Sequence, residues 1–368
     1  MRRLLVTGGA GFIGSNFVHY WMENHPEERI VVLDALTYAG NLANLGSLTA
    51  RPELRFVRGN ICDRSLVEQL LRNEQIDTIV HFAAESHVDR SIAGPSAFVE
   101  TNVVGTHALL EAARKVWLEE RRAPRHRFHH VSTDEVYGSL GPDDAPFKED
   151  DTYEPNSPYS ATKAASDHLV RAYHRTYGLE VTTSNCSNNY GPYHFPEKLI
   201  PLTIVNILEG QPLPIYGDGR NVRDWLHVRD HCQGIDRIIS QGRAGDVYNI
   251  GGRSECENLQ LVQKLCEEMD TAFRARPELC QRFPASPVSR GIPASRLIKF
   301  VQDRPGHDRR YAIDSTKIER ELGFSATVTL EEGLSRTVRW YLENEPWWRA
   351  VMDGRYRQWL DTHYGSAI

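Results

Sequence analysis

The sequence predicts an α/β fold, in which a doubly wound parallel sheet is joined to a smaller α/β domain in the C-terminal part. Short apolar runs, typical of buried strands, alternate with longer segments of helical periodicity through the first half of the chain. After Tyr190, closely spaced prolines and glycines break this alternation. A chain of 368 residues also exceeds the usual size of one hydrophobic core, so two closely joined domains are expected.

The predicted strands of the main sheet are the apolar runs 4–7, 30–33, 54–57, 76–82, 128–132 and 181–184. Two of the intervening segments, 96–114 and 159–177, carry apolar residues at three- and four-residue spacing and are predicted helices. A late strand is expected at 247–251, back in the same sheet. Residues 274–296 contain four prolines and predict a long loop, of the kind that is usually functional or disordered.

These elements divide the chain into two predicted domains. The first spans 1–190 and receives the chain again near 231–256 and 316–337. The second spans 191–368, mainly through 191–230, 257–315 and 338–368. In an open α/β sheet, ligands bind in the crevice at the carboxyl ends of the strands, so the site is expected there.

The composition disfavours nucleic-acid and membrane partners. Lys and Arg number 43 against 49 Asp and Glu, a net charge of −6, whereas binders of nucleic acid or membrane surfaces normally carry a basic excess. No apolar run reaches the roughly 18 residues of a membrane span, and glycines interrupt the apolar N-terminal stretch. The six cysteines form no CxxC pair and are expected to be reduced. We therefore expect a cytoplasmic protein.

A glycine-rich turn after the first predicted strand is typical of a dinucleotide site. Gly8, Gly11 and Gly14 follow that strand and open a helix, which lets the backbone approach a pyrophosphate at the helix N-terminus. Asp34 closes the second strand about 20 residues later, where a carboxylate accepts from a ribose 2′-hydroxyl and repels a 2′-phosphate. Close helix–strand packing is the alternative for the glycines, and a helix cap for Asp34. The combination favours NAD over NADP, in a Rossmann-type domain.

Tyr159 and Lys163 form a candidate base. They are four residues apart, so they share one face of the predicted helix, and an ammonium beside a phenol favours the phenolate. Thr133, at the end of a predicted strand, is expected to bond the substrate oxygen that Tyr159 deprotonates. A solvated tyrosine stacked on a lysine stem is the alternative.

Two adjacent carboxyl groups, Asp134 and Glu135, follow Thr133 directly. An elimination needs one group to take a proton from carbon and another to protonate a departing hydroxyl, and two carboxyls with separated pKa values divide these roles. A simple dehydrogenase or epimerase gives them no chemical task. A helix N-cap and a solvated acid are the alternative.

With these motifs the chain resembles the extended short-chain dehydrogenase/reductase superfamily and, within it, the dTDP-glucose 4,6-dehydratase family. The similar stretches cover nearly the whole chain: VTGGAGFIGSNFV at 6–18, HFAAESHVDRSI at 81–92, STDEVYG at 132–138, PYSATKAASDHLV at 158–170, SNNYGPYHFPEKLIPL at 187–202, PIYGDGRNVRDWLHVRDH at 214–231, YNIGG at 248–252 and DRPGHDRRYAID at 303–314. The TDE triplet at 133–135 is the discriminating feature, because related 4-epimerases generally lack the acid pair. The resemblance implies a lyase of nucleotide-sugar metabolism and deoxysugar biosynthesis.

The resemblance also implies a mechanism that converts dTDP-glucose to dTDP-4-dehydro-6-deoxy-glucose and water. Tyr159, with Thr133 at the same oxygen, removes the 4-hydroxyl proton while NAD+ takes the C4 hydride. Glu135 then removes the C5 proton, Asp134 protonates the departing C6 hydroxyl, and the hydride returns to C6. NAD+ is thereby regenerated and is expected to stay tightly bound.

Two sets of binding residues follow from the same resemblance. The cofactor is expected to contact Gly8, Gly11, Phe12, Ile13, Gly14, Asp34, Ala35, Leu36, Thr37, Asn60, Ile61, Phe82, Ala83, Ala84, Glu85, Ser86, Thr101, Tyr159, Lys163 and Asn189. The nucleotide sugar is expected to contact Ser86, Thr133, Asn188, Lys198, Leu199, Pro214, Ile215, Tyr216, Arg223, Asn258, Asp303, Arg304, Pro305, Gly306 and His307. Lys198 and Arg223 supply the cations that a diphosphate needs. Asn60 stands where the family usually has Asp, which implies weaker binding of the same cofactor.

A homodimer is the implied assembly, in which the predicted helices 96–114 and 159–177 of each subunit form a four-helix interface. The alternative is that both apolar stripes face the chain's own sheet. No metal is expected, because His81 and His307 have no second ligand at metal-site spacing. Two other functions stay open: a dehydratase acting on GDP-mannose or a UDP-sugar, and a catalytically idle NAD-binding regulator, in which the intact catalytic residues would have no task.

Overall fold

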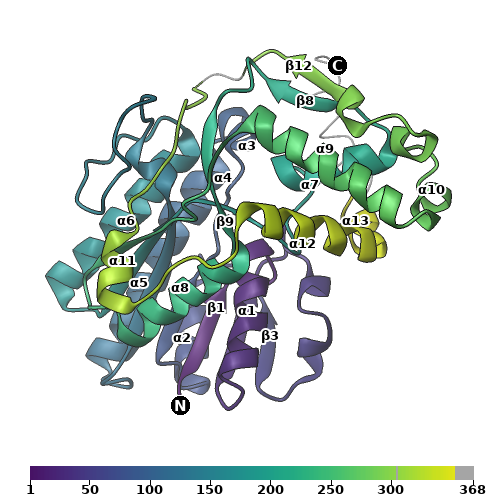
Figure 1. Cartoon of the computed structure of the whole chain (residues 1–368). Helices are drawn as coiled ribbons and strands as arrows, with labels where there is room; N and C mark the ends of the chain where they lie inside the picture. Colours follow the sequence, from purple (N-terminus) through teal and green to yellow (C-terminus); the bar gives the residue numbers. More distant parts are fainter. Residues whose placement is uncertain (304–305, 353–368) are drawn as a thin grey trace.

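A seven-stranded parallel sheet with helices packed against it forms the larger part of the molecule; β1 and β3 of this sheet are labelled in the lower part of Figure 1. The structure is a computed structural model that describes residues 1–303 and 306–352. The strands lie in the order β10-β6-β5-β4-β1-β2-β3, and all neighbouring pairs are parallel. Their bounds are β1 (Arg3–Thr7), β2 (Arg29–Asp34), β3 (Leu54–Arg58), β4 (Thr78–His81), β5 (Arg127–Thr133), β6 (Val181–Cys186) and β10 (Val247–Ile250). The doubly wound parallel sheet predicted from the sequence is confirmed.

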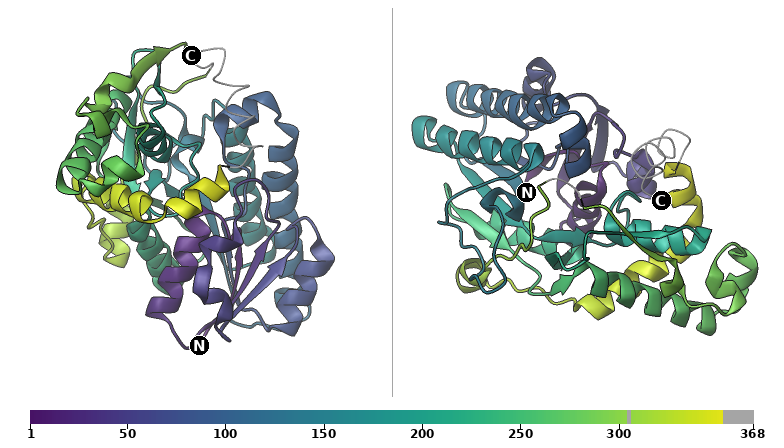
Figure 2. Two further views of the ribbon diagram at one scale, coloured as in Figure 1. Left: turned by 90° about the vertical axis from the view of Figure 1, so that its right-hand side faces the viewer. Right: turned by 90° about the horizontal axis from the view of Figure 1, so that it is seen from above.

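Helices cover both faces of the sheet, because successive strand residues point to opposite sides (Figure 2). Leu4 and Val6 of β1 pack into one core with α1, α8 and α11, whereas Leu5 packs into the other core with α2, α5 and α6. The bounds of these helices are α1 (Phe12–Asn24), α2 (Arg64–Asn73), α5 (Thr106–Ala113), α6 (Pro158–Tyr177), α8 (Val228–Gln241) and α11 (Thr316–Leu322). The sheet therefore has no solvent-facing side, and its ligand crevice opens at the carboxyl ends of its strands.

The two long predicted helices both exist. The first is a continuous helical segment from Ser96 to Glu119, longer than predicted, in which α4 (Ser96–Phe98) and α5 alternate with two π-helical stretches, η3 (Val99–Gly105) and η4 (Arg114–Glu119). The second, α6, begins with a reciprocal capping box between Ser157 and Ser160. It ends at Gly178, whose φ of 76° is the left-handed conformation that terminates helices. These signals place Tyr159 in the first turn of α6.

Besides these two cores, a separate hydrophobic core lies beyond the carboxyl ends of the sheet and belongs to the smaller, second domain; it is called the second core below. Its residues come mainly from helices that pack on two small sheets, β11-β9-β7 and β12-β8. The bounds are β7 (Asn188–Tyr190), α7 (Leu199–Glu209), β8 (Leu213–Tyr216), β9 (Val222–His227), β11 (Glu255–Glu257), α9 (Asn258–Ala275), β12 (Ile298–Val301), α12 (Leu330–Glu343) and α13 (Glu345–Val351). The part of the predicted second domain at 353–368 lies outside the described residues.

The long loop predicted at 274–296 is wrong. Those residues complete α9 and then form three short helical turns, α10 (Glu278–Arg282), η6 (Pro287–Arg290) and η7 (Ala294–Leu297). Leu279, Phe283 and Ala294 are buried in the second core. The prolines start or interrupt these turns rather than exclude them, since proline is compatible with the first helical position. Among the described residues, no helix combines the length and apolarity needed to span a bilayer.

Candidate active site

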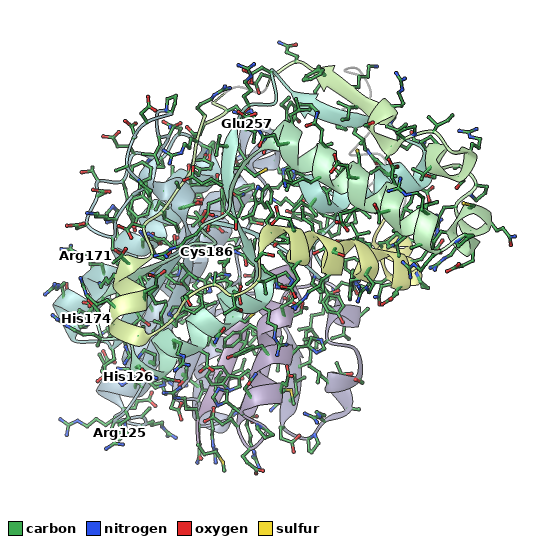
Figure 3. The ribbon with its side chains drawn as sticks, viewed as in Figure 1. Arg125, His126, Arg171, His174, Cys186 and Glu257 are labelled. Carbon is green, nitrogen blue, oxygen red and sulfur yellow. The ribbon has the colours of Figure 1, made fainter. Side chains whose placement is uncertain are left out.

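A cavity of about 460 Å³ lies where the carboxyl ends of β1, β2, β4, β5 and β6 meet the second domain. Two residues labelled in Figure 3 mark the cavity: Cys186, the last residue of β6, and Glu257, the last residue of β11. Cys186 lines the cavity, and so does Asn258, which follows Glu257 in the chain. The strand order changes direction here, because β1 lies between β2 and β4. This is the switch point at which doubly wound sheets bind ligands.

The glycine turn at one end of this cavity allows a close backbone approach. A Cβ on Gly8, whose φ is 70°, would lie 2.6 Å from the amide nitrogen of Ala83. A Cβ on Gly14 would lie 2.2 Å from the carbonyl oxygen of Gly8. Helix α1 then begins without a side-chain cap, so its first amides face the cavity as an anion site. The glycines therefore serve helix–strand packing and leave room for a pyrophosphate.

Asp34 ends β2 as an oriented acceptor. Its carboxylate accepts from the amides of Ala10 at 2.9 Å and Leu36 at 2.8 Å, and it caps no helix. Burial raises its pKa, while the two amide bonds oppose that rise. A Cβ on Gly40 would lie 2.8 Å from Asp34 Oδ1, so the chain folds closely around the acid. The oriented Asp34 carboxylate fits the adenosine ribose of NAD, whose 2′-hydroxyl can donate to it. The 2′-phosphate of NADP would be repelled by the same carboxylate.

The cavity brings together most of the residues predicted to bind cofactor or substrate. All the predicted cofactor residues line it except Leu36, whose amide acts through Asp34. The predicted substrate residues that line it are Ser86, Thr133, Asn188, Lys198, Leu199, Pro214, Tyr216, Arg223, Asn258 and His307. Ile215 is buried in the second core instead, because alternate residues of β8 face opposite sides. Asp303 and Gly306 do not line the cavity, and Arg304 and Pro305 lie outside the described residues.

The acid pair begins a short helix, η5 (Asp134–Tyr137), at the end of β5. Thr133 is its N-cap: the hydroxyl accepts from the amide of Glu135 at 3.3 Å. Asp134 is 2% exposed, and its Oδ2 has no partner among the described residues. Burial raises the pKa of Asp134 well above its usual range, and the charge of Glu135 adds to the rise. Asp134 is therefore a carboxylic acid with a proton to give, next to a less buried carboxyl group.

Tyr159 and Lys163 face the same cavity from α6. Burial, and next the charge of Glu135, raise the pKa of Tyr159 well above its usual value, whereas a hydrogen bond with Thr133 lowers it. The Lys163 ammonium donates to the carbonyl oxygen of Val131 at 2.8 Å. Burial lowers the pKa of Lys163. The pair thus shares a face as predicted, with the lysine anchored on β5.

Two cations approach the substrate end from different segments: Arg223 is buried and Lys198 is partly exposed. Lys198 donates to the carbonyl oxygen of Ser86 at 3.1 Å. Arg223, 5% exposed, donates to the carbonyl oxygen of Asp308 at 3.0 Å and stacks on Tyr311, its guanidinium carbon 4.3 Å from the ring centroid. Asn258 Oδ1 is buried without a hydrogen-bond partner among the described residues. The two cations suit a diphosphate, and the Asn258 amide oxygen can accept a hydrogen bond from the rest of a nucleotide sugar.

Sequence reasoning missed one cluster at the mouth of the cavity. Arg90 lies over the Tyr38 ring, 3.9 Å from its centroid, and donates to Glu197 at 3.2 Å. Phe195 meets Tyr38 edge to face. These residues come from the loop after β2, from α3 (Val88–Ala93) and from the loop before α7. Arg90, Phe195 and Glu197 lie within stretches quoted for the resemblance, but nothing local assigns them a role, because their contact with Tyr38 depends on how these segments pack.

The comparisons with known proteins agree with this geometry. A family model described as GDP-mannose 4,6 dehydratase matches residues 5–337. The dTDP-glucose 4,6-dehydratase of Xanthomonas campestris is 55% identical over 97% of this chain and 98% of its own, and that of Salmonella typhimurium is 49% identical over 98% and 99%.

The solved structures give the same result. DesIV of Streptomyces venezuelae, a dTDP-glucose 4,6-dehydratase determined with NAD bound, has a TM-score of 0.84 at 51% identity, over 95% of this chain and 99% of its own. The UDP-glucose 4-epimerase of Thermotoga maritima follows at 28% identity and a TM-score of 0.77, over 93% and 99%. The resemblance stated from the motifs is confirmed. The chain belongs to the family of nucleotide-sugar 4,6-dehydratases, in which these relatives are dTDP-glucose 4,6-dehydratases.

Proposed function

We propose that this chain is an NAD-dependent dTDP-glucose 4,6-dehydratase, a hydro-lyase that forms dTDP-4-dehydro-6-deoxy-glucose and water. The observation that carries the proposal is the buried acid Asp134 beside Glu135, facing the same cavity as Tyr159. An epimerase needs no such pair, because it transfers hydride at C4 and eliminates nothing. Relatives at 48–55% identity carry the dehydratase name, which supports the substrate.

The cofactor is NAD, and Asp34 and the glycine turn would hold it at one end of the cavity. When bound, it supplies a hydride acceptor for the sugar C4 that later donates the same hydride to C6. It is therefore regenerated in each cycle, and release is not part of turnover. This agrees with a site built from buried groups rather than from an open surface.

Tyr159 removes the proton of the 4-hydroxyl in the first step. Its raised pKa keeps the phenol protonated, so positive charge near the ring is needed to form the base. Lys163, one helical turn away, is the cation in position to supply it. Thr133 holds the same substrate oxygen, because its hydroxyl already faces the tyrosine.

The acid pair performs the elimination. Once C4 is a ketone, the C5 proton is acidic, and Glu135, the less buried carboxyl group, removes it. Asp134 protonates the C6 hydroxyl as it leaves, which requires the carboxyl to hold its proton at neutral pH. Burial keeps that proton in place. The division of labour follows from the different environments of two adjacent residues.

An isotope experiment tests the reaction. The purified protein converts dTDP-glucose that carries deuterium at C4, and mass and NMR spectra of the product are recorded. We expect a product lighter by one water, with the deuterium at C6, and solvent deuterium at C5 when the reaction runs in heavy water. A product of unchanged mass with inverted C4 identifies an epimerase and overturns the proposal.

Two other functions remain to be compared in the same assay. The description of the matching family model favours GDP-mannose, and UDP-sugars share the diphosphate. A panel of nucleotide sugars therefore accompanies dTDP-glucose, with protection from thermal unfolding as a second measurement. The largest protection and turnover are expected with dTDP-glucose. A catalytically idle NAD-binding regulator would turn over none of the panel.

We also propose a homodimer through the helical segment 96–119 and α6. Four of the exposed large apolar side chains lie on or directly beside these elements: Ile92, Val99, Val104 and Tyr177. A four-helix contact between two copies would bury them. Light scattering is expected to give twice the chain mass, and a monomer at all concentrations would contradict the assembly.

The proposed location is the cytoplasm, and the proposed division into domains is the one predicted from the sequence, except that 330–337 joins the second domain. All six cysteines are free thiols in the structure, which is compatible with a reducing compartment. Helix α12 packs in the second core, whereas α8, β10 and α11 pack with the main sheet. Cell fractionation and limited proteolysis test the two proposals.

A further inference from the structure

Asp167 is a buried carboxylate that has no part in the mechanism above. It lies one helical turn beyond Lys163 on α6, and the two residues are 6% and 4% exposed. A buried charge is costly unless it is paired, so its presence here needs a physical reason. We propose that Asp167 is a positioning residue whose negative charge keeps Lys163 in its ammonium form and so allows Tyr159 to act as a base near neutral pH. This inference rests on the proposed function.

Strand β5 holds both members of the pair in one geometry. His130 Nε2 donates to Asp167 Oδ1 at 3.0 Å, and Ser132 Oγ donates to Oδ2 at 2.8 Å. The carbonyl oxygen of the residue between them, Val131, accepts from Lys163 at 2.8 Å. Three successive residues of β5 therefore fix the carboxylate and the ammonium, and the next residue along the strand is Thr133 of the active site.

The Asp167 carboxylate is ionised at neutral pH, at which the enzyme is expected to work. Burial raises the pKa of Asp167 to about 6, while Lys163, Ser132 and Tyr153 oppose that rise. For Lys163, burial lowers the pKa, and Asp167 is the largest influence that raises it. Without this carboxylate, the buried ammonium would lose its main electrostatic support.

No other titratable neighbour among the described residues supplies an equivalent charge. His130 on β5 and His81 on β4 are neutral, because burial holds both pKa values well below the usual range. The Cys186 thiol of β6 is also neutral, since burial raises its pKa far above its usual value. Burial likewise raises the pKa values of the phenols Tyr137 and Tyr153, which face the pair from η5 and from the segment before α6. His168 follows Asp167 on α6 and brings no negative charge.

Asp167→Asn removes the charge at nearly constant shape. The variant is expected to fold, because His130 Nδ1 has no partner among the described residues. The ring proton can move to Nδ1, and Nε2 then accepts from the new amide, while Ser132 donates to the amide oxygen. Should this variant not fold, Asp167→Ser, which leaves room for a water molecule beside His130, is measured instead and judged by the same outcome.

The experiment follows the first oxidation as a function of pH. In a Glu135→Gln background, in which elimination is blocked, NADH absorbance is recorded after rapid mixing with dTDP-glucose. The midpoint of the rate profile is expected to move to higher pH by on the order of one unit on replacing Asp167. A second readout is the tyrosinate absorbance of the NAD-bound protein as a function of pH, measured as the difference from the same protein with Tyr159→Phe. Its midpoint should move in the same direction, and this measurement requires no turnover.

Two control variants separate charge from structure. Asp167→Glu keeps the charge, so its midpoint should stay near the parent value even if its rate falls. Asp230→Asn removes another buried carboxylate, which accepts from Thr327 and Val328, and should reduce stability without moving the midpoint.

An unchanged or lower midpoint in Asp167→Asn overturns the inference, as does an equal upward shift in Asp167→Glu. If the Glu135→Gln protein forms no NADH and the unsubstituted protein forms no dehydrated product, the proposed function is refuted instead. The two failures are therefore distinguishable.

Discussion

The two ends of the cavity are built in different ways. At the cofactor end, one continuous stretch supplies the glycine turn and the start of α1, and the next strand adds Asp34, oriented by two backbone amides. At the substrate end, Lys198, Arg223 and Asn258 come from three separate elements of the second domain. The difference teaches that a site made of backbone needs a contiguous motif, whereas a site made of long side chains needs only a fold that gathers them.

The proposed catalytic residues lie between these two ends of the cavity. Thr133 ends β5, Asp134 and Glu135 begin η5 directly after it, and Tyr159 and Lys163 lie on α6. Substitutions there should affect the chemistry without removing either ligand. Substitutions at either end should affect one ligand and spare the other.

The largest effect is expected between the two ends. Tyr159→Phe removes the base and should lower turnover by about 10²- to 10⁴-fold, because general base catalysis typically contributes that much. NAD content and dTDP-glucose binding should stay close to those of the parent, and no transient NADH absorbance should appear. Turnover within a few-fold of the parent value would show that another group takes the 4-hydroxyl proton.

A smaller effect is expected at the substrate end. Arg223→Gln should raise KM for dTDP-glucose by roughly 10- to 100-fold, since a hydrogen bond to a charged group contributes about 1.5–3 kcal/mol. The NAD content of the purified protein should not change. Arg309→Gln is the matched control, because Arg309 pairs with Asp218 nearby but does not line the cavity. Equal KM values for both variants would remove Arg223 from the diphosphate site.

At the cofactor end, Gly14→Ala should reduce stability and NAD content together. Its Cβ would lie 2.2 Å from a backbone oxygen, and such overpacking typically costs about 1–3 kcal/mol. Gly11→Ala is the comparison: its Cβ would lie 3.2 Å from the same oxygen, so a smaller loss of stability is expected. Urea unfolding and the absorbance of released dinucleotide measure the two quantities. A Gly14→Ala protein as stable as the parent would contradict the close approach.

The smallest effect concerns pH and Asp134. Burial raises the pKa of this acid in the folded chain, so above about pH 3.9 the folded state binds more protons than the unfolded state. Its contribution to stability is therefore present at low pH and is lost as pH rises toward the folded pKa. Asp134→Asn should gain stability relative to the parent between pH 5 and 8, by at most about 1.4 kcal/mol per pH unit.

Asp218→Asn provides the opposite sign when the series is extended below pH 5. Arg309 lowers the pKa of the exposed Asp218, so that residue favours the folded state at higher pH. Urea unfolding of the three proteins at several pH values measures the slopes. Parallel slopes for the parent and Asp134→Asn would show that Asp134 is ionised in the folded chain, which would remove it as the acid of the elimination.

Local sequence alone determined the sheet and the glycine turn, and its motifs gave the proposed catalytic residues. The alternation of apolar runs predicted the strands of the main sheet, and the spacing of Tyr159 and Lys163 predicted a shared helix face. These inferences hold because strand and helix periodicity act over a few residues and require no knowledge of distant partners.

Other features were decided by the tertiary structure. The prolines of 274–296 predicted a loop, but burial of Leu279 and Phe283 in the second core stabilises short helical turns there. The partners of Lys163 were also hidden from the sequence, because the carbonyl of Val131 and the bonds of Asp167 to β5 depend on how α6 packs on the sheet. Sequence spacing fixes which residues share a helix face. Burial and the groups packed against that face decide which of them stay charged.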